Sequence, residues 1–251
     1  MSALGNTGND PETSSVTFSL AAPMAWTNNA GYSDDDTRSA FHVSPAAQVK
    51  ASKTIGDVRL EGRASLGSDI YSRAEENNLS FLQARFQLSV AHAGPWRFTP
   101  YFRYRARAEY SDSFFGEYDS TIHDFSVGGT KDISAFFKVP VTLDLFVLRR
   151  ESTSAGRERW QPGATASAEG SFGHSQWGWS LEQSIQGRFF TAGANEGRND
   201  FYASTYGGIT LNIGRKWKLT VAEATLEWNS SDAADRDYLV LNVGASLSAS
   251  F

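Results

Sequence analysis

The chain has 251 residues, no cysteine and a formal net charge of −5. These values exclude disulfides, thiolate metal sites and a general basic field that would attract nucleic acid. Hydrophobic residues make up 40% of the chain, mean hydropathy is −0.38, and no apolar run approaches the roughly 18 residues of a spanning helix. A spanning β-strand buries only alternate residues, so this composition fits a soluble protein and a membrane barrel equally well.

Apolar and polar side chains alternate with a period of two along most of the chain, which predicts β-strands. Residues 1–15 lack the basic and apolar regions of a secretory signal, and we interpret them as a polar, flexible tail at a mature N-terminus. Residues 16–251 are predicted to form one domain without helices. Its roughly twelve strands are expected near residues 16–26, 40–53, 57–68, 79–91, 96–109, 121–131, 137–150, 160–171, 176–190, 200–213, 216–229 and 238–251.

The connections between these strands alternate in length. Tight turns are predicted at TIGD (54–57), HAGP (92–95), FGHS (172–175) and GRK (214–216), with a slightly longer one near KDISAF (131–136). Long polar loops are predicted at 27–38, 68–78, 110–121, 151–159, 191–199 and 229–237. Turns at one rim and loops at the other are typical of an all-β, antiparallel, up-and-down transmembrane barrel with short periplasmic turns and long extracellular loops. A sandwich with Greek-key crossings has no reason to produce this pattern.

The two faces of the strands support the same architecture. In 79–91, Leu82, Phe86 and Leu88 share one face, and Gln83 and Arg85 lie on the other. Aromatic side chains gather at strand ends, as at a membrane interface: Trp26, Tyr71, Trp96, Tyr110, Trp160, Trp177, Trp217, Trp228 and Tyr238. The alternative is a soluble β protein with scattered core aromatics.

The C-terminal segment YLVLNVGASLSASF (238–251) resembles the final strand of bacterial outer-membrane β-barrels, in which a terminal aromatic and alternating apolar residues form the signal for barrel assembly. Tyr238, Val243, Leu247 and Phe251 match that pattern, whereas Ala249 is smaller than the residue usual at its position. The resemblance implies a Gram-negative outer-membrane location, with partners that include outer-membrane lipids, lipopolysaccharide and the barrel assembly machinery.

The segment RFTPYFRYRARAEY (97–110) places aromatic residues on one face and arginines on the other. With lipid outside, the arginines face the lumen of the barrel. The predicted substrate-binding wall comprises Arg59, Arg63, Arg85, Arg97, Arg103, Arg105 and Arg107. The opposite wall is predicted to be acidic, with Asp144, Glu169 and Glu182 and, beside a suspected bulge near Ala222–Ala224, Glu223 and Glu227.

Arginines at fixed spacing bind carboxylates, sulfates and phosphates, which predicts a channel for small hydrophilic, anionic solutes. The layout and charge resemble those of small twelve-stranded porins for acidic oligosaccharides, and no specific motif of theirs is matched. The alternative is a barrel plugged by pairing of these charges, with a structural or adhesive role for its loops.

A lipid-modifying hydrolase is the enzymatic alternative. His42 and Ser44 superficially resemble the His-x-Ser of outer-membrane phospholipases, but the residues that follow differ, and both side chains are predicted to face inward, away from lipid. No pair of histidines has metal-ligand spacing. SDDD (33–36) could bind calcium, but we interpret it as a solvated acidic loop. We therefore predict no catalytic residues, no metal and no cofactor.

Overall fold

The structure is a computed structural model that describes residues 13–30, 38–91, 98–134, 139–173, 176–214, 216–233 and 236–251. Its strands are β1 (Thr13–Thr27), β2 (Ala40–Val43), β3 (Ala46–Ile55), β4 (Val58–Tyr71), β5 (Leu79–Val90), β6 (Thr99–Ser111), β7 (Tyr118–Ser134), β8 (Pro140–Ser152), β9 (Arg159–Ser171), β10 (Trp177–Phe190), β11 (Asn199–Ile213), β12 (Trp217–Ser231) and β13 (Tyr238–Ser250). Two short 3₁₀ turns, η1 (Glu75–Asn77) and η3 (Gly193–Asn195), lie in connections. Within these residues no helix is long and apolar enough to cross a membrane.

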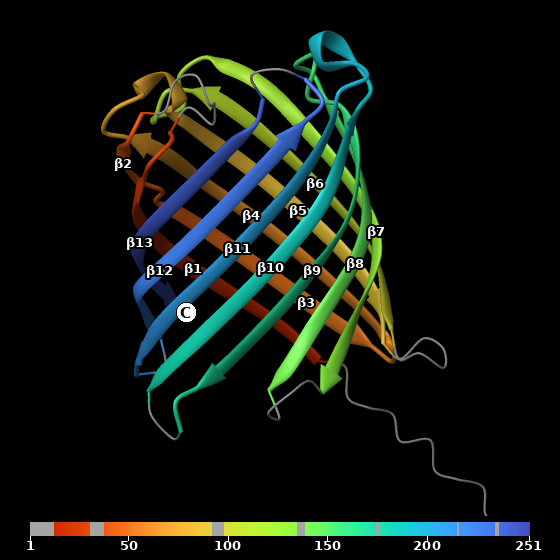
Figure 1. Ribbon diagram of the computed structural model, residues 1–251. Coiled ribbons are helices and arrows are strands. Elements are labelled where there is room, and N and C mark those ends of the chain that lie inside the picture. Colours follow the sequence, from red (N-terminus) through yellow and green to blue (C-terminus); the bar gives the residue numbers. More distant parts are fainter. Residues whose placement is uncertain are drawn as a thin grey trace, which may run out of the picture.

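Neighbouring strands pair antiparallel, and β13 pairs with β1, so the sheet closes into a barrel (Figure 1). β1 begins at Thr13 and so includes the last residues of the predicted tail. The predicted strand 40–53 is divided into β2 and β3, which pair with β1 and β4 in one unbroken register and form a single stave of the barrel. The division falls at Ser44 and Pro45, because proline has no N–H to donate to the ladder. The described chain thus builds twelve staves from thirteen strands, which confirms the predicted fold class.

Large apolar side chains cover the outside of the barrel. Leu82, Val127 and Leu239 are 45%, 58% and 53% exposed. Aromatic residues of similar exposure, 41–54%, form two girdles at the strand ends: Trp26, Trp160, Phe189, Phe201 and Trp228 at one rim, and Trp177, Trp217 and Phe251 at the other. This outer surface fits a hydrocarbon layer bounded by two interfaces.

Two of the tyrosines predicted for the girdles face inward instead. Tyr71 stacks on His42, with ring centroids 5.2 Å apart, on the lumen side of β4. The hydroxyl of Tyr238 lies 3.4 Å from Nη1 of Arg188 inside the barrel. Both residues alternate in step with the inward-facing residues of their strands. This alternation, and not their position at a strand end, decides which way their side chains point.

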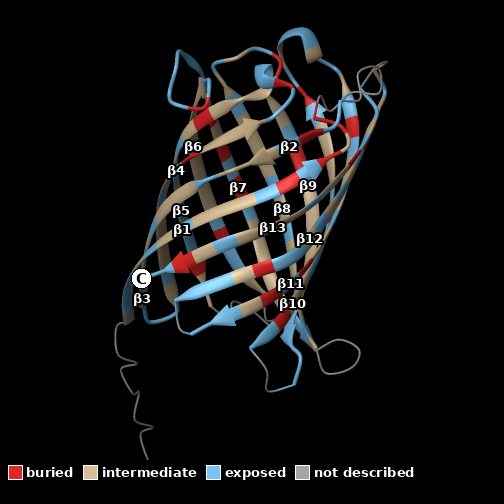
Figure 2. Ribbon diagram, turned by 90° about the vertical axis from the view of Figure 1, so that its left-hand side faces the viewer, coloured by how far each residue is buried: buried red, intermediate tan, exposed pale blue. Residues whose placement is uncertain are grey.

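One rim carries the connections predicted as loops, at 28–39, 72–78, 112–117, 153–158, 191–198 and 232–237; we call it the loop rim, and the other the turn rim. Several strands extend further into these loops than predicted, as β4 does to Tyr71 and β7 from Tyr118. Many of the most buried residues lie near the loop rim (Figure 2): Thr27, Asn29, Ser80, Ser120, Asp124, Asp200, Asn229 and Val240.

The loop 112–117 folds down over the outer surface. Ser68 Oγ donates to Ser113 O at 2.6 Å, and Ser80 Oγ donates to Asp112 O at 3.0 Å. Both serines have outward parity, so the loop covers two hydroxyls that would otherwise meet the interface. It leaves Phe114 85% exposed at the rim.

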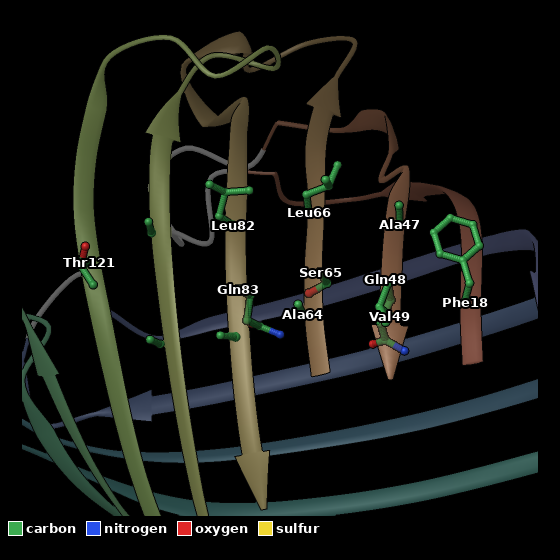
Figure 3. A pocket seen from close by; sticks show the side chains of 13 residues that line it. Phe18, Ala47, Gln48, Val49, Ala64, Ser65, Leu66, Leu82, Gln83 and Thr121 are labelled. Carbon is green, nitrogen blue, oxygen red and sulfur yellow. The ribbon is translucent and has the colours of Figure 1, made fainter. Parts of the chain in front are cut away.

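Below this loop, an apolar groove of about 480 Å³ crosses the outer surface of β1 and β3 to β7 (Figure 3). Its floor is made of alanines, among them Ala64, Ala84 and Ala106, and Leu66 and Leu82 flank them. The lining of the groove is mainly apolar and includes no charged side chain, so the groove offers no ion-pair partner to an anionic solute.

Candidate functional site: the charged lumen

The six described arginines of the predicted wall share the inner face of three adjacent strands: Arg59 and Arg63 on β4, Arg85 on β5, and Arg103, Arg105 and Arg107 on β6. Arg97 lies outside the described residues, as do HAGP (92–95) and SDDD (33–36).

Pairing between strands extends this wall into a longer feature. One register row runs from Lys50 on β3 across Arg63, Arg85, Arg105 and Asp124 to Arg150 and Arg159. We call its six cations the basic ramp: Lys50, Arg63, Arg85, Arg105, Arg150 and Arg159. A row perpendicular to tilted strands climbs the wall of a barrel. The row begins opposite Thr17, near the turn-rim end of β1, and ends opposite Phe190, the last residue of β10.

Glu61 is the shared acidic partner at the lower end of the ramp. Its Oε1 accepts a hydrogen bond from Nε of Arg63 at 2.7 Å and lies 2.7 Å from Nη2 of the same side chain. Its Oε2 lies 3.0 Å from Nζ of Lys50 and 3.5 Å from Nη2 of Arg59. One carboxylate therefore serves three cations.

Asp124 is the acidic partner in the middle of the ramp. Its side chain is 3% exposed and pairs with both Arg105 and Arg150, the latter through Nε and Nη2 at 2.8 and 3.0 Å. The sequence reasoning missed Asp124, together with Lys50 and Arg159. The signal was present, because Asp124 shares the parity of Ser126 on the polar face of the predicted strand 121–131.

Arg107 belongs to a second group nearer the loop rim. Its Nε lies 2.8 Å from Oε1 of Glu109, and its Nη2 lies 4.0 Å from Asp69. Arg157, from the loop 153–158, reaches the other oxygen of Glu109 at 2.5 Å and Ser120 Oγ at 3.1 Å. This contact ties a loop to the inner wall.

Asp144 does not lie opposite the arginines, contrary to the sequence prediction. Its Oδ1 accepts from the hydroxyl of Tyr101 at 2.8 Å, and its Oδ2 lies 3.8 Å from Nη2 of Arg103. The reason is that β8 lies only two staves from β6, and long side chains span that separation.

Glu169 and Glu182 face the lumen from β9 and β10, and both border a cavity of about 480 Å³ with Asp132 and Tyr206. Glu223 and Glu227 also face inward, where they accept hydrogen bonds from Tyr206 at 3.2 Å and Tyr202 at 2.9 Å. The predicted bulge is confirmed, with a register shift between Thr220 and Glu223. Within the described chain no basic side chain forms an ion pair with any of these four glutamates.

The residues predicted as an assembly signal lie on two faces. Val243, Leu247 and Phe251 point outward and are 47%, 42% and 54% exposed, whereas Tyr238 points inward. The backbone of Phe251 exchanges two hydrogen bonds with that of Phe18, at 2.8 and 3.1 Å, at the seam between β13 and β1.

Side chains that could act together in catalysis are few among the described residues. His42 Nδ1 and Ser44 Oγ are 3.5 Å apart, at the limit of a hydrogen bond. His92 and His174 lie outside the described residues. Among the residues that are described, no cluster of three His, Asp or Glu side chains has the arrangement of a metal site.

No protein-family model and no curated protein sequence matches the chain. Among solved structures it is similar to an outer membrane channel from Pseudomonas putida F1, with a TM-score of 0.57 and 12% identity over 99% of this chain and 100% of that one. LpxR from Salmonella typhimurium matches at a TM-score of 0.48 and 12% identity, over 91% of this chain and 99% of that one. An anion-selective porin from Comamonas acidovorans matches at a TM-score of 0.47 and 7% identity, over 96% of this chain and 100% of that one.

At such low identity these likenesses concern the fold alone, and the two scores below 0.5 carry no weight. The first likeness, with a TM-score of 0.57, agrees with the closed antiparallel sheet described above. The outer surface of this sheet is apolar and carries two aromatic girdles. The chain is a transmembrane β-barrel with the fold of bacterial outer-membrane proteins.

Proposed function

We propose that this barrel is an outer-membrane channel for small hydrophilic solutes and that it favours anions. The observation that carries the proposal is the basic ramp, which places six cations on one continuous inner row between the two rims. Successive staves lie about 4.8 Å apart, so a solute with several negative groups meets a new cation at almost every stave. An acidic sugar or a short acidic oligosaccharide has that distribution of charge.

The acidic far wall limits the preference. Glu169, Glu182, Glu223 and Glu227 face the same lumen, and Glu61 and Asp124 cancel part of the ramp. We therefore expect a modest anion preference that weakens with salt, because screening acts over about 10 Å at 0.1 M. The role proposed is transport and not catalysis, with lipopolysaccharide and lipid around the barrel and the assembly machinery acting on its last strand.

Bilayer recordings test the proposal. The purified barrel should conduct in a planar bilayer, and a KCl gradient should give a reversal potential of anion sign. Replacing Arg85 and Arg103 by Ser should move that potential toward cations, since neither side chain touches lipid. Arg149→Ser is the matched control, because Arg149 lies over Trp160 on the outer face and should leave the potential unchanged.

A closed barrel is the second candidate, and the loop rim favours it. Asn195 Nδ2 donates to Gly156 O at 2.7 Å, Asn77 Nδ2 donates to Ala30 O at 2.9 Å, and Arg157 binds Glu109. These contacts tie loops to one another and to the inner wall. Absence of any conductance from correctly folded protein would replace the channel by a structural or adhesive barrel.

A further inference from the structure

Two neighbouring guanidinium groups on the inner wall share a single neutral acceptor. Arg85 Nη2 donates to Gln87 Oε1 at 2.9 Å, and Arg103 Nε donates to the same oxygen at 3.0 Å. Gln87 and Arg103 are directly paired between β5 and β6, and Arg85 is the next inward residue on β5. The amide oxygen satisfies hydrogen bonds but cancels no charge, so Arg85 has no ion pair and Arg103 has only the loose one with Asp144.

The carboxylates nearby have other partners. Both oxygens of Glu61 are engaged by Arg63, Lys50 and Arg59. Asp144 accepts from Tyr101 and reaches Arg103 only at 3.8 Å. The group Lys50, Arg59, Arg63, Arg85 and Arg103 thus faces two carboxylates and keeps an excess of three positive charges.

Arg85 also retains an unused donor. Its Nε is shielded from solvent and has no acceptor among the described residues, and Arg85 forms no ion pair with them. A shielded donor without an acceptor is unfavourable, because no hydrogen bond offsets its removal from water. An oxyanion in the adjoining cavity supplies the negative charge that Gln87 does not provide.

The surroundings provide space and orientation for such a group. A cavity of about 460 Å³ borders Arg85, Gln87 and Arg103 in the half of the lumen next to the turn rim. The guanidinium carbon of Arg103 lies 4.5 Å from the centroid of the Tyr101 ring, which fixes the plane of its donors. Tyr101 is itself held by its bond to Asp144.

We propose that Arg85 and Arg103, positioned by Gln87, form a discrete binding site for a multiply charged oxyanion, with a phosphoryl or sulfo group as the chemical class. The inference rests on the proposed function, because the anion reaches the site through the lumen. It deepens that function, because it assigns one binding site along the path of the solute. A monovalent carboxylate uses fewer of the available donors and binds more weakly than a tetrahedral dianion.

Inorganic phosphate is the probe. Calorimetric titration of the full chain folded in uncharged detergent, at constant ionic strength, should show saturable binding of phosphate and weaker binding of acetate. Gln87→Glu places a carboxylate between the two guanidiniums and should weaken phosphate binding at least about tenfold, since it neutralises the charge that the ligand needs. Arg85→Lys keeps the charge, loses the fork of donors, and should weaken binding as well.

Ser246→Glu is the matched control. It adds the same charge to the inner face of β13, which is separated from β5 by β1, the stave of β2 and β3, and β4. It should change phosphate binding by less than about twofold, because screening and distance reduce its effect on the site. Equal losses in Ser246→Glu and Gln87→Glu, or equal affinities for phosphate and acetate, would mean a diffuse lumen potential and would overturn the site.

The same protein in a bilayer separates the two proposals. Conductance without saturable phosphate binding overturns this site and leaves the channel. Saturable phosphate binding that Gln87→Glu removes, in a barrel that does not conduct, establishes the site and overturns the channel.

Discussion

Charge pairs inside the lumen differ in how far each depends on its partner. Asp124 is 3% exposed and holds Arg105 and Arg150, whereas Asp144 is 21% exposed and 3.8 Å from its arginine. Removing one member of a buried pair leaves an uncompensated charge, while a loose, hydrated pair contributes little. The two aspartates should therefore respond differently to the same substitution.

Asp124→Asn should lower the free energy of unfolding by about 3 kcal/mol, because it leaves two guanidiniums on a neutral side chain. Asp144→Asn should cost less than about 1 kcal/mol, because the amide oxygen still accepts from Tyr101. Urea unfolding from lipid vesicles, followed by tryptophan fluorescence, measures both. Equal losses would show that burial does not distinguish the two sites.

Parity along single strands was enough to place the six described arginines of the predicted wall on the lumen side, because the side-chain period of a strand is two. It could not predict their partners. The pair Arg105–Asp124 depends on the register between β6 and β7. Asp144 was predicted on the wall opposite the arginines, whereas β8 is close enough to β6 for Asp144 to reach Arg103. Nothing in the sequence singles out Gln87, because its role as the shared acceptor of Arg85 and Arg103 depends on the pairing of β5 with β6.

At the scale of the strands, the alternating pattern located every stave within a few residues. It missed the interruption at Pro45 and the path of the loop 112–117 over the outer wall. The first depends on a missing N–H that periodicity does not register, and the second on hydroxyls of two other strands. Loop conformation of that kind is set by tertiary contacts.

A charge at mid-strand distinguishes the two faces directly. Ala84 lies on the outer face of β5, and Gln83 beside it has the parity of the lumen-facing Arg85. Ala84→Arg should cost about 2–4 kcal/mol in a bilayer, as arginine does on the lipid face near the midplane. Gln83→Arg should cost less than about 1 kcal/mol in a wet lumen, and unfolding from vesicles compares them. A reversed order would mean that the faces have been assigned the wrong way round.

The last strand should be indispensable for closure. β13 pairs with both β12 and β1, so deleting residues 240–251 leaves two unpaired edges in lipid, where each unsatisfied backbone group costs several kcal/mol. The truncated chain should lose the heat-modifiable folded band on a gel. A chain starting at Thr13 is the control, since it keeps all of β1. Persistence of the band in the truncated chain would mean that another segment closes the sheet.

The whole molecule places its apolar surface outside and its charges inside, the reverse of a soluble protein. The folded chain should therefore need detergent or lipid, and its circular dichroism should show a sheet with little helix. Diluting the detergent below its micellar concentration should cause aggregation. A monomer that remains in solution after this dilution would contradict the lipid-facing assignment.

The seam between β1 and β13 also sets the order of events during folding. Leu241 N donates to Oδ1 of Asn28, which lies 213 positions earlier in the sequence, at 2.7 Å. Contacts of such sequence separation must overcome a large loss of chain entropy before they return any stability, and folding dominated by them is slow. Neither edge of the sheet finds its final partner until β13 has been synthesised. Until then the chain carries two open β-edges and its full apolar surface, so its survival depends on how fast it is protected from aggregation as much as on the stability of the closed barrel.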